Sequence, residues 1–505
     1  MSGNLYALFQ SRFPKDLSRP CIKQPGRPDL SYQAIDELSA QYAGWLRQAG
    51  IRKGDRVAVQ VEKSVEAVFL YLGCLRVGAI YLPLNTGYTA AELDYFIGDA
   101  GPSIFVCASD VQATLAPVCE KHAVNLLMTL DADGKGSLIE ALAECSPAPA
   151  VEVCDPDDLA AILYTSGTTG RSKGAMLSHR NLASNAMTLH RIWGWSGDDM
   201  LIHALPIFHV HGLFVAIHCV LVAGAAMWFL PAFDAKAITG LMKHATVLMG
   251  VPTFYTRLLD EPSFTKEACT GMRLFISGSA PLLEQTFHDF EKRTGMRILE
   301  RYGMSEAGMI TSNPLEGARI AGTVGFPLPD VEARIADENG KLLPPGENGI
   351  LEIRGPNLFQ GYWQMPEKTA GEFRPGGWFI TGDIACMDQE GRVSIIGRAK
   401  DLIISGGYNV YPKEVELAVD GLPGILESAV IGLPHRDFGE AVTAIIVPDG
   451  SDELVEADLI RALSEALARF KQPKRMIIRD ALPRNSMGKV QKAALRQEYK
   501  HLYQA

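Results

Sequence analysis

The segment LYTSGTTGRSKGA (163–175) joins an apolar stretch to a loop of Ser, Thr and Gly that holds two cations. Such a loop offers unhindered backbone N–H groups, several hydroxyls and Lys173, all of which suit a polyphosphate. It is not a Walker A motif, because its glycine spacing differs and the following GAMLSH (174–179) predicts a strand rather than a helix. A flexible polar hairpin is the alternative, but the density of small polar residues beside Lys173 favours a phosphate-binding loop.

Upstream of this loop the sequence alternates between the periodicities of strands and helices. We expect strands at RVAVQV (56–61), AIYLPL (79–84) and SIFVCAS (103–109), with helices at 64–77 and 90–99. This alternation predicts an α/β fold whose N-terminal body consists of βαβ layers with largely parallel sheets. In such sheets, ligands bind where the strands end.

Downstream of Gly340 the pattern changes to closely spaced short strands, which predict a β-rich, more antiparallel subdomain. The last hundred residues predict a small α+β domain, since they contain a strand pair, a helix from Pro412 and a hairpin. The expected strand pair is RVSIIG (392–397) with DLIIS (401–405), and the expected hairpin joins 427–434 to 440–448. We therefore predict an N-terminal domain over 1–397 and a C-terminal domain over 398–505.

Composition excludes several classes of protein. The 505 residues are 47% hydrophobic and carry a net charge of −10, with acidic and basic residues interspersed, so a nucleic-acid partner is not expected. The nine cysteines form no C-x-x-C pair, which is typical of reduced thiols, and the cytoplasm is the expected location. The apolar run 213–230 reaches the length of a membrane span, but His218 and Gly224 favour a buried helix followed by a strand.

Three further motifs have two interpretations each when taken alone. In RYGMSE (301–306), Ser305 could hold a phosphate oxygen and Glu306 could bind Mg²⁺, or the segment could be a surface turn. Asp383 in ITGD could accept both ribose hydroxyls, or it could form a turn. The small residues of SGSAPL (277–282) allow close approach of a flat ligand, or they form only a tight turn.

These motifs and several others follow one another in a definite order along the chain. After 163–175 come HALPIFHVHGL (203–213), SGSAPL (277–282), RYGMSEAGM (301–309), GWFITGD (377–383), GRAKDLIISGGYNVYPKEVE (397–416) and LPRNSMGKVQK (482–492). This set, which covers most of the chain, resembles the ANL superfamily of adenylate-forming enzymes: acyl-CoA synthetases, standalone adenylation domains and luciferases.

The resemblance implies ATP, Mg²⁺ and CoA as ligands. Glu306 and Thr165 would bind the metal, Asp383 the ribose, and Tyr302 would stack on adenine. The remaining expected ATP-binding residues are Ser166, Gly167, Thr168, Thr169, Gly170, Lys173, Ser279, Ala280, Pro281, Gly303, Met304, Ser305 and Arg398.

The resemblance also gives roles to the C-terminal motifs. Lys489, by composition an ordinary surface lysine, would approach the α-phosphate and the attacking carboxylate, and is thus expected to be catalytic together with Glu306 and Lys173. Lys400 would be the hinge about which the small domain rotates between two half-reactions, although an ordinary turn is the alternative. The loop Ser405, Gly406, Gly407 and Tyr408 would then line the CoA thiol channel.

Arg257 is the residue expected to select the acid. On a mostly apolar helix it should either reach solvent or pair with a carboxylate, and a guanidinium suits the second carboxylate of a diacid. GVPTFYTRLL (250–259) is similar to malonyl-CoA synthetases, in which an Arg at this place binds the distal carboxylate. The expected substrate is therefore malonate or a similar small dicarboxylic acid, including methylmalonate, in a pocket bordered by His209, Val210, Ser277, Ser279 and Met309.

The implied reaction is ATP-dependent formation of malonyl-CoA, AMP and pyrophosphate through a malonyl-adenylate. A ligase for another short, medium-chain or aromatic acid is the closest rival. An adenylation enzyme that loads a carrier protein and a catalytically inactive nucleotide-binding regulator are further alternatives. Lys173, Glu306, Asp383 and Lys489 together argue against the last of these.

Overall fold

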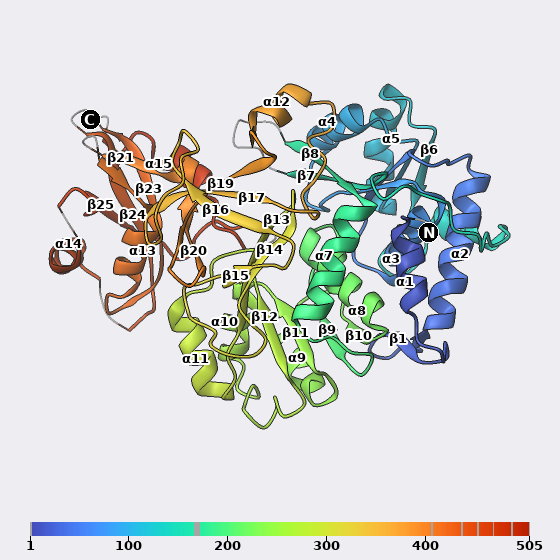
Figure 1. Ribbon diagram of the computed structural model, residues 1–505, viewed down its shortest axis with the longest axis horizontal. Helices are drawn as coiled ribbons and strands as arrows, with labels where there is room; N and C mark the ends of the chain where they lie inside the picture. Colours follow the sequence, from blue (N-terminus) through green and yellow to red (C-terminus); the bar gives the residue numbers. More distant parts are fainter. Residues whose placement is uncertain are drawn as a thin grey trace.

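The computed structural model describes residues 3–165, 172–405, 408–435, 438–451, 454–467, 469–485 and 488–503 (Figure 1). The side chains of 408, 409, 465 and 466 are not described either. Four sheets form within these ranges. Three of them belong to the larger N-terminal part, and the fourth lies at one end of the long axis of the molecule, at the left of Figure 1.

The first sheet has six strands in the order β6-β5-β3-β4-β7-β8 and is parallel except for the pair β7–β8. Its strands are β3 (Arg56–Gln60), β4 (Ile80–Pro83), β5 (Ile104–Cys107), β6 (Leu126–Thr129), β7 (Leu159–Thr165) and β8 (Lys173–Ser178). Its helices are α2 (Tyr32–Gln48), α3 (Val65–Val77), α4 (Ala90–Ala100), α5 (Gln112–Lys121) and α6 (Ser137–Ala143), with the short helix η1 (Ser109–Val111). The predicted βαβ alternation is thus confirmed.

Local sequence signals explain where these helices begin and end. The Ser64 side chain accepts a hydrogen bond from the Ala67 N–H and caps α3, which ends at Gly78 with φ +73°. Thr89 and Glu92 form a capping box at the start of α4.

The second sheet has nine strands in the order β15-β14-β13-β12-β11-β9-β10-β1-β2. They are β1 (Pro20–Lys23), β2 (Leu30–Ser31), β9 (Met200–His203), β10 (Ala226–Phe229), β11 (Val247–Gly250), β12 (Leu274–Ser277), β13 (Leu299–Met304), β14 (Gly308–Ser312) and β15 (Phe326–Pro327). From β1 to β13 the pairs are parallel, whereas β13–β14 and β14–β15 are antiparallel. The strand pairing therefore changes from parallel to antiparallel at β13, the strand that carries the first four residues of RYGMSE (301–306).

Helices between and around the two large sheets complete one apolar core, which contains Val57 and Val59 of β3 as well as Leu201 and Ile202 of β9. The helices are α1 (Leu5–Arg12), α7 (His179–Ile192), the π-helix η2 (His211–Ile217), α8 (His218–Ala223), α9 (Ala235–Leu241), η3 (Met242–His244), α10 (Pro252–Asp260) and α11 (Glu284–Thr294). The expected apolar helix and strand within 213–230 are confirmed as η2, α8 and β10. Across the described ranges, no helix is long and apolar enough to cross a membrane.

The third sheet is antiparallel and forms the predicted β-rich subdomain. It contains β16 (Glu332–Ala336), β17 (Asn348–Arg354), β18 (Phe373–Arg374), β19 (Trp378–Met387) and β20 (Val393–Arg398), with α12 (Pro366–Gly371) before β18. The predicted pairing of 392–397 with 401–405 is wrong. The first of these segments forms β20, which completes a hairpin with β19 across the turn at 388–391, whereas the second forms β21.

The fourth sheet belongs to the small C-terminal α+β part and has the order β22-β21-β24-β23, with β25 beside β24. Its elements are η4 (Ala399–Asp401), β21 (Ile403–Ser405), β22 (Tyr408–Val410), α13 (Pro412–Asp420), β23 (Ile425–His435), β24 (Gly439–Pro448), α14 (Glu456–Ala466), β25 (Arg475–Ile478) and α15 (Lys492–Tyr499). The predicted hairpin is confirmed as β23–β24. The boundary at 397/398 and the mobility of this part stay predictions.

Candidate active site

Glu306 lies on the turn between β13 and β14, where the direction of the second sheet changes. Its carboxylate is buried and accepts a hydrogen bond from the Tyr362 hydroxyl at 3.1 Å, with the Thr165 hydroxyl at 3.4 Å. Burial raises the pKa of the Glu306 carboxyl. The structure therefore brings together Thr165 and Glu306, the two residues predicted to bind a metal.

These two oxygen groups suit Mg²⁺, a hard cation that takes only one or two protein ligands and fills its shell with phosphate oxygens and water. No cluster of three or more His, Cys, Asp or Glu that could hold a metal occurs in the described ranges. Any Mg²⁺ beside Glu306 would thus share its coordination with a phosphate ligand.

Lys173, the first residue of β8, is held by groups that the sequence analysis missed. Its ammonium forms an ion pair with Glu372 at 2.9 Å and lies 4.1 Å from the centre of the Tyr362 ring. The Tyr362 hydroxyl donates to Glu372 at 2.7 Å. Lys173 and Glu306 are therefore joined through Tyr362 and Glu372. The predicted loop residues Ser166, Gly167, Thr168, Thr169 and Gly170 lie outside the described residues.

Asp383, on β19, forms a second buried polar group with two other predicted ATP-binding residues. Arg398 pairs with one of its carboxylate oxygens at 2.8 Å, and the Tyr302 hydroxyl donates to the other. Burial raises the pKa of Asp383, although the Arg398 guanidinium opposes this effect.

The loop after β12 has a strained backbone. Ser279 has φ +73°, which is unfavourable for a residue with a side chain, and its hydroxyl lies 3.3 Å from His211 Nδ1. Ala280 is half-buried and Pro281 is exposed.

The end of β13 packs tightly against β14. Gly303 lies so close to the β14 backbone that a Cβ there would be 2.2 Å from the Gly308 oxygen. The half-buried Met304 and Ser305 follow.

Arg301 is the principal site residue that the sequence analysis missed. It is only 2% exposed, on β13, and neither Nε nor Nη2 has a hydrogen-bond partner within the described part of the chain. A Cβ at Gly278 would lie 2.5 Å from its guanidinium carbon, so the guanidinium packs directly against the Gly278 backbone. Burial lowers the pKa of Arg301 to about 9.

Two other fully buried polar atoms also lack partners among the described residues, namely His211 Nε2, near Arg301, and Ser277 Oγ, whose residue pairs with Glu300 across β12 and β13. Burial, with the Arg301 charge, lowers the pKa of His211 well below its ordinary value. The half-buried His209 has its pKa lowered to about 3 by burial and by the cations Lys489 and Arg301. Buried polar atoms are normally paired, and a buried guanidinium beside a neutral histidine can supply hydrogen bonds that an anion accepts.

Val210 and Met309 are buried apolar neighbours of these groups. Of the residues that the sequence analysis expected around the acid, Ser279 contacts His211, and His209 lies near His211. Ser277, the last residue of β12, pairs with Glu300, and Met309 on β14 pairs with Gly303. A shared acid pocket for these four residues stays a prediction.

Arg257 is exposed on α10, with its guanidinium 5.9 Å from the centre of the Phe233 ring, while Phe254, Tyr255 and Leu258 form the buried face of the helix. This matches the alternative in which the side chain reaches solvent. Its expected role in binding the distal carboxylate stays a prediction.

Lys489 reaches the site from the small domain. The residue as a whole is exposed, but its ammonium is partly withdrawn from water by the groups around it, and this desolvation lowers its pKa. The guanidinium groups of Arg398 and Arg301 lower the pKa further. The carboxylates of Asp383 and Glu306 raise it. Its neighbour Gly488 is close to α10, where a Cβ would lie 3.3 Å from Thr253 Oγ1. Lys489 therefore faces the same groups as the other predicted catalytic residues.

The other C-terminal predictions are less directly described. Lys400 is exposed in η4, between β20 and β21, and Ser405 is buried on β21. Gly406 and Gly407 lie outside the described residues, as does the side chain of Tyr408.

Comparisons with known proteins give the family of the chain and several similar structures. The family model described as AMP-binding enzyme matches residues 9–363, and the AMP-binding enzyme C-terminal domain matches 414–489. Among curated relatives, the mitochondrial malonate–CoA ligase ACSF3 of Mus musculus is 36% identical, covering 89% of this chain and 83% of that protein. The long-chain-fatty-acid–CoA ligase of Escherichia coli O6:H1 is 32% identical, covering 98% and 94%.

Among solved structures, ATP-bound MatB from Rhodopseudomonas palustris is 54% identical, with 100% of both chains covered and a TM-score of 0.97. Apo MatB from the same organism has the same identity and coverage, with a TM-score of 0.86.

Proposed function

This chain belongs to the family of AMP-binding enzymes, and on that premise we propose that it is an ATP-dependent malonate–CoA ligase, an AMP-forming acid–thiol ligase. The observation that carries the proposal is the buried Arg301, whose Nε and Nη2 have no hydrogen-bond partner among the described residues. A dicarboxylic acid has two negative ends, and a ligase for it needs a receptor for the carboxylate that does not react.

Arg301 supports binding of the distal carboxylate because a guanidinium offers parallel N–H groups that match two carboxylate oxygens. The neutral His211, whose Nδ1 lies 3.3 Å from the Ser279 hydroxyl, adds a further hydrogen-bonding group. A monocarboxylate would leave the Arg301 guanidinium buried without a partner, which is costly. Met309 and Val210 bound the pocket with apolar surface, so a short acid is favoured over a long one.

In the first half-reaction a malonate carboxylate oxygen attacks the α-phosphorus of ATP, and pyrophosphate leaves. Negative charge increases around the phosphorus, so the catalytic requirement is positive charge held in place rather than a general base. Lys489 meets this requirement for the α-phosphate. The higher TM-score with ATP-bound than with apo MatB supports the view that the small domain is placed for this step.

Glu306 and Thr165 would hold Mg²⁺, which when bound neutralises phosphate charge. Asp383 would bind the ribose hydroxyls, and Tyr302 would lie against adenine with Ser279, Ala280 and Pro281. Lys173, which is anchored by Glu372, would fix the start of β8 below the phosphates.

In the second half-reaction the CoA sulfur attacks the acyl carbon of malonyl-adenylate, the bond to the phosphate oxygen breaks, and AMP leaves. The thiol proton passes to solvent. We propose that 398–505 rotates about Lys400 between the two steps, so that the Ser405 loop replaces Lys489 at the site.

The experiment that tests this function is AMP release with ATP, Mg²⁺ and CoA across malonate, methylmalonate, succinate, acetate, octanoate and 4-coumarate. A strong preference for malonate is expected. Activity confined to monocarboxylates would overturn the substrate and the role of Arg301, whereas inactivity with every acid would favour a carrier-loading enzyme or a regulator.

A further inference from the structure

The turn that carries Glu306 is held by amide side chains from two other parts of the fold. Asn185, on α7, makes a pair of hydrogen bonds with the backbone of Met309, donating to its oxygen at 2.9 Å and accepting from its N–H at 3.1 Å. Only 6% of Asn185 is exposed. One amide therefore fixes both backbone polar groups of a residue that also bounds the acid pocket.

Asn357 holds the same turn from the segment that follows β17. Its amide donates to the Ala307 oxygen at 2.7 Å and to the Met309 oxygen at 3.0 Å, and it is 4% exposed. From the same segment, the Phe359 N–H donates to the oxygen of Glu306 itself at 2.7 Å. Residues 306, 307 and 309 thus all have backbone groups bonded to partners outside the β13–β14 hairpin.

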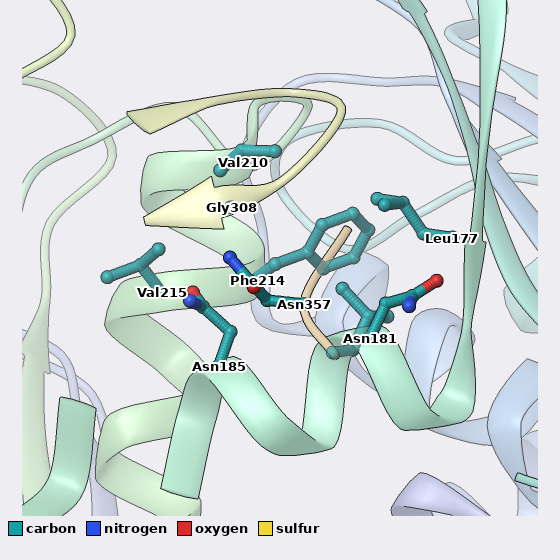
Figure 2. A pocket seen from close by; sticks show the side chains of 9 residues that line it. Leu177, Asn181, Asn185, Val210, Phe214, Val215, Gly308 and Asn357 are labelled. Atoms are coloured by element: carbon teal, nitrogen blue, oxygen red, sulfur yellow. The ribbon is translucent and has the colours of Figure 1, made fainter. Parts of the chain in front are cut away.

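Gly308 shows how closely Asn185 fits this turn. Its φ is +59°, and a Cβ there would lie 2.7 Å from Asn185 Oδ1. Figure 2 shows Asn185 and Asn181 on one helix with Gly308 on the strand above them. With Asn357 and Val210 they border a cavity of about 10 Å³, which is close to the smallest space that can hold one water molecule.

The base of this arrangement is anchored as well. Asn181 lies one helical turn before Asn185, and its amide donates to the oxygens of Pro356 and Leu358 on either side of Asn357. Because α7 follows β8 directly, the same short stretch of chain carries Lys173 at one end and the supports of the Glu306 turn at the other.

We propose that Asn185 and Asn357 are positioning residues that hold the Glu306 carboxylate and the Met309 wall of the acid pocket in one fixed relation. Both residues act through the turn and touch neither the metal nor the acid. This inference rests on the proposed function, since it takes Glu306 as the carboxylate that binds Mg²⁺ beside the phosphates. Loss of either amide would let Glu306 move from its place and weaken the Mg²⁺-dependent part of ATP binding.

The test is calorimetric binding of a non-hydrolysable ATP analogue to the full chain, with Mg²⁺ and with EDTA. Asn185→Leu keeps the approximate volume of the side chain but loses both hydrogen bonds. We expect the gain in affinity that Mg²⁺ brings to fall by about tenfold, with little change in EDTA. The matched control is Asn4→Leu, because Asn4 is also buried and donates to two backbone oxygens, those of Leu75 and Glu152, far along the chain.

If Asn185→Leu does not fold, Asn185→Ala replaces it, since water can enter the enlarged cavity and bond to the Met309 backbone. Equal loss of affinity with and without Mg²⁺, or a change shared by the Asn4 control, would mean that Asn185 is only structural and would overturn the inference. An unchanged Mg²⁺ effect would overturn it too. A wild-type chain that binds the analogue no better with Mg²⁺ would overturn the proposed function itself.

Discussion

The two cations that we propose act on the substrate, Arg301 and Lys489, lie in opposite kinds of environment. Arg301 is buried on the central part of a large sheet, between β12 and β14, and belongs to the fold of the larger domain. Lys489 is exposed, follows a short turn and reaches the site from the small domain. The difference suggests a division of labour, because a charge that must recognise the acid in every step should be permanent, whereas one that serves a single step should be removable.

Removing the exposed cation should have the largest effect. Lys489→Ala is expected to lower adenylate formation about 10³-fold, since a charge that stabilises the transition state is lost. Conversion of supplied malonyl-adenylate by CoA should persist. Pyrophosphate exchange and thioester formation measure the two steps separately. Lys492→Ala is the control, because that lysine pairs with Glu416 inside the small domain. Equal loss of both steps would contradict the division of labour.

Removing the buried cation should change selectivity instead. Arg301→Met is expected to lower kcat/KM for malonate about 10²-fold, or about 3 kcal/mol, relative to acetate, because only malonate presents a second carboxylate. Arg301→Lys should recover part of this loss, since it restores charge without the planar fork. A thermal unfolding curve for each variant controls for folding. A uniform loss across acids would assign Arg301 to stability alone.

The contrast between the domains should also appear in acid. Burial lowers the pKa of His218 to about 3, against about 6.5 in an unfolded chain. Because the unfolded state binds the proton between these values, stability is complete above pH 6.5 and falls as the pH is lowered towards 3. At pH 5 the loss is about 2 kcal/mol from this one residue.

The buried histidines in the described ranges, His179, His203, His211 and His218, all belong to the larger domain, as do all six tryptophans of the chain. Urea unfolding followed by tryptophan fluorescence at pH 7 and pH 5 therefore reports this domain. His218→Gln, which can still bond to the Tyr71 hydroxyl, should reduce the pH dependence. An unchanged slope in this variant would show that His218 is not the titrating group.

The smallest effect is expected at the other arginine. With Arg301 as the selector, Arg257→Ala should change kcat/KM for malonate by less than about twofold, and the free energy of unfolding by no more than about 0.5 kcal/mol, because Arg257 is exposed. The same panel of acids provides the measurement. A selective loss of malonate use in this variant would restore Arg257 as the selector and would remove the distinction drawn for Arg301.

The two arginines also show what could be predicted from the sequence. The βαβ layers and the antiparallel β-rich region follow from periodicity, and the convergence of Thr165 with Glu306 follows from ordered motifs. The exposure of Arg257 also follows from the sequence, because the helical period places Phe254, Tyr255 and Leu258 on one face and Arg257 on another. Its role as the selector of the acid stays a prediction.

Other features depend on packing between distant segments. Arg301 lies inside one of the motifs, but its guanidinium packs against Gly278, just after the neighbouring strand β12, and this contact is not visible in the local sequence. Glu372 is separated from Lys173 by about two hundred residues, and no local pattern indicates their contact. The turn at 388–391 is the local signal for the hairpin of β19 with β20, whereas the pairing predicted for 392–397 crosses the predicted domain boundary.

The Asp383 carboxylate has a consequence for nucleotide release. Both of its oxygens have partners within the protein: Arg398 pairs with one, and the Tyr302 hydroxyl donates a hydrogen bond to the other. A ribose that bonds to Asp383 exchanges one set of partners for another, so the nucleoside moiety adds little net affinity. Retention of the nucleotide then depends on its phosphates, and AMP, which has lost two of them, has the weakest hold when product release completes the cycle.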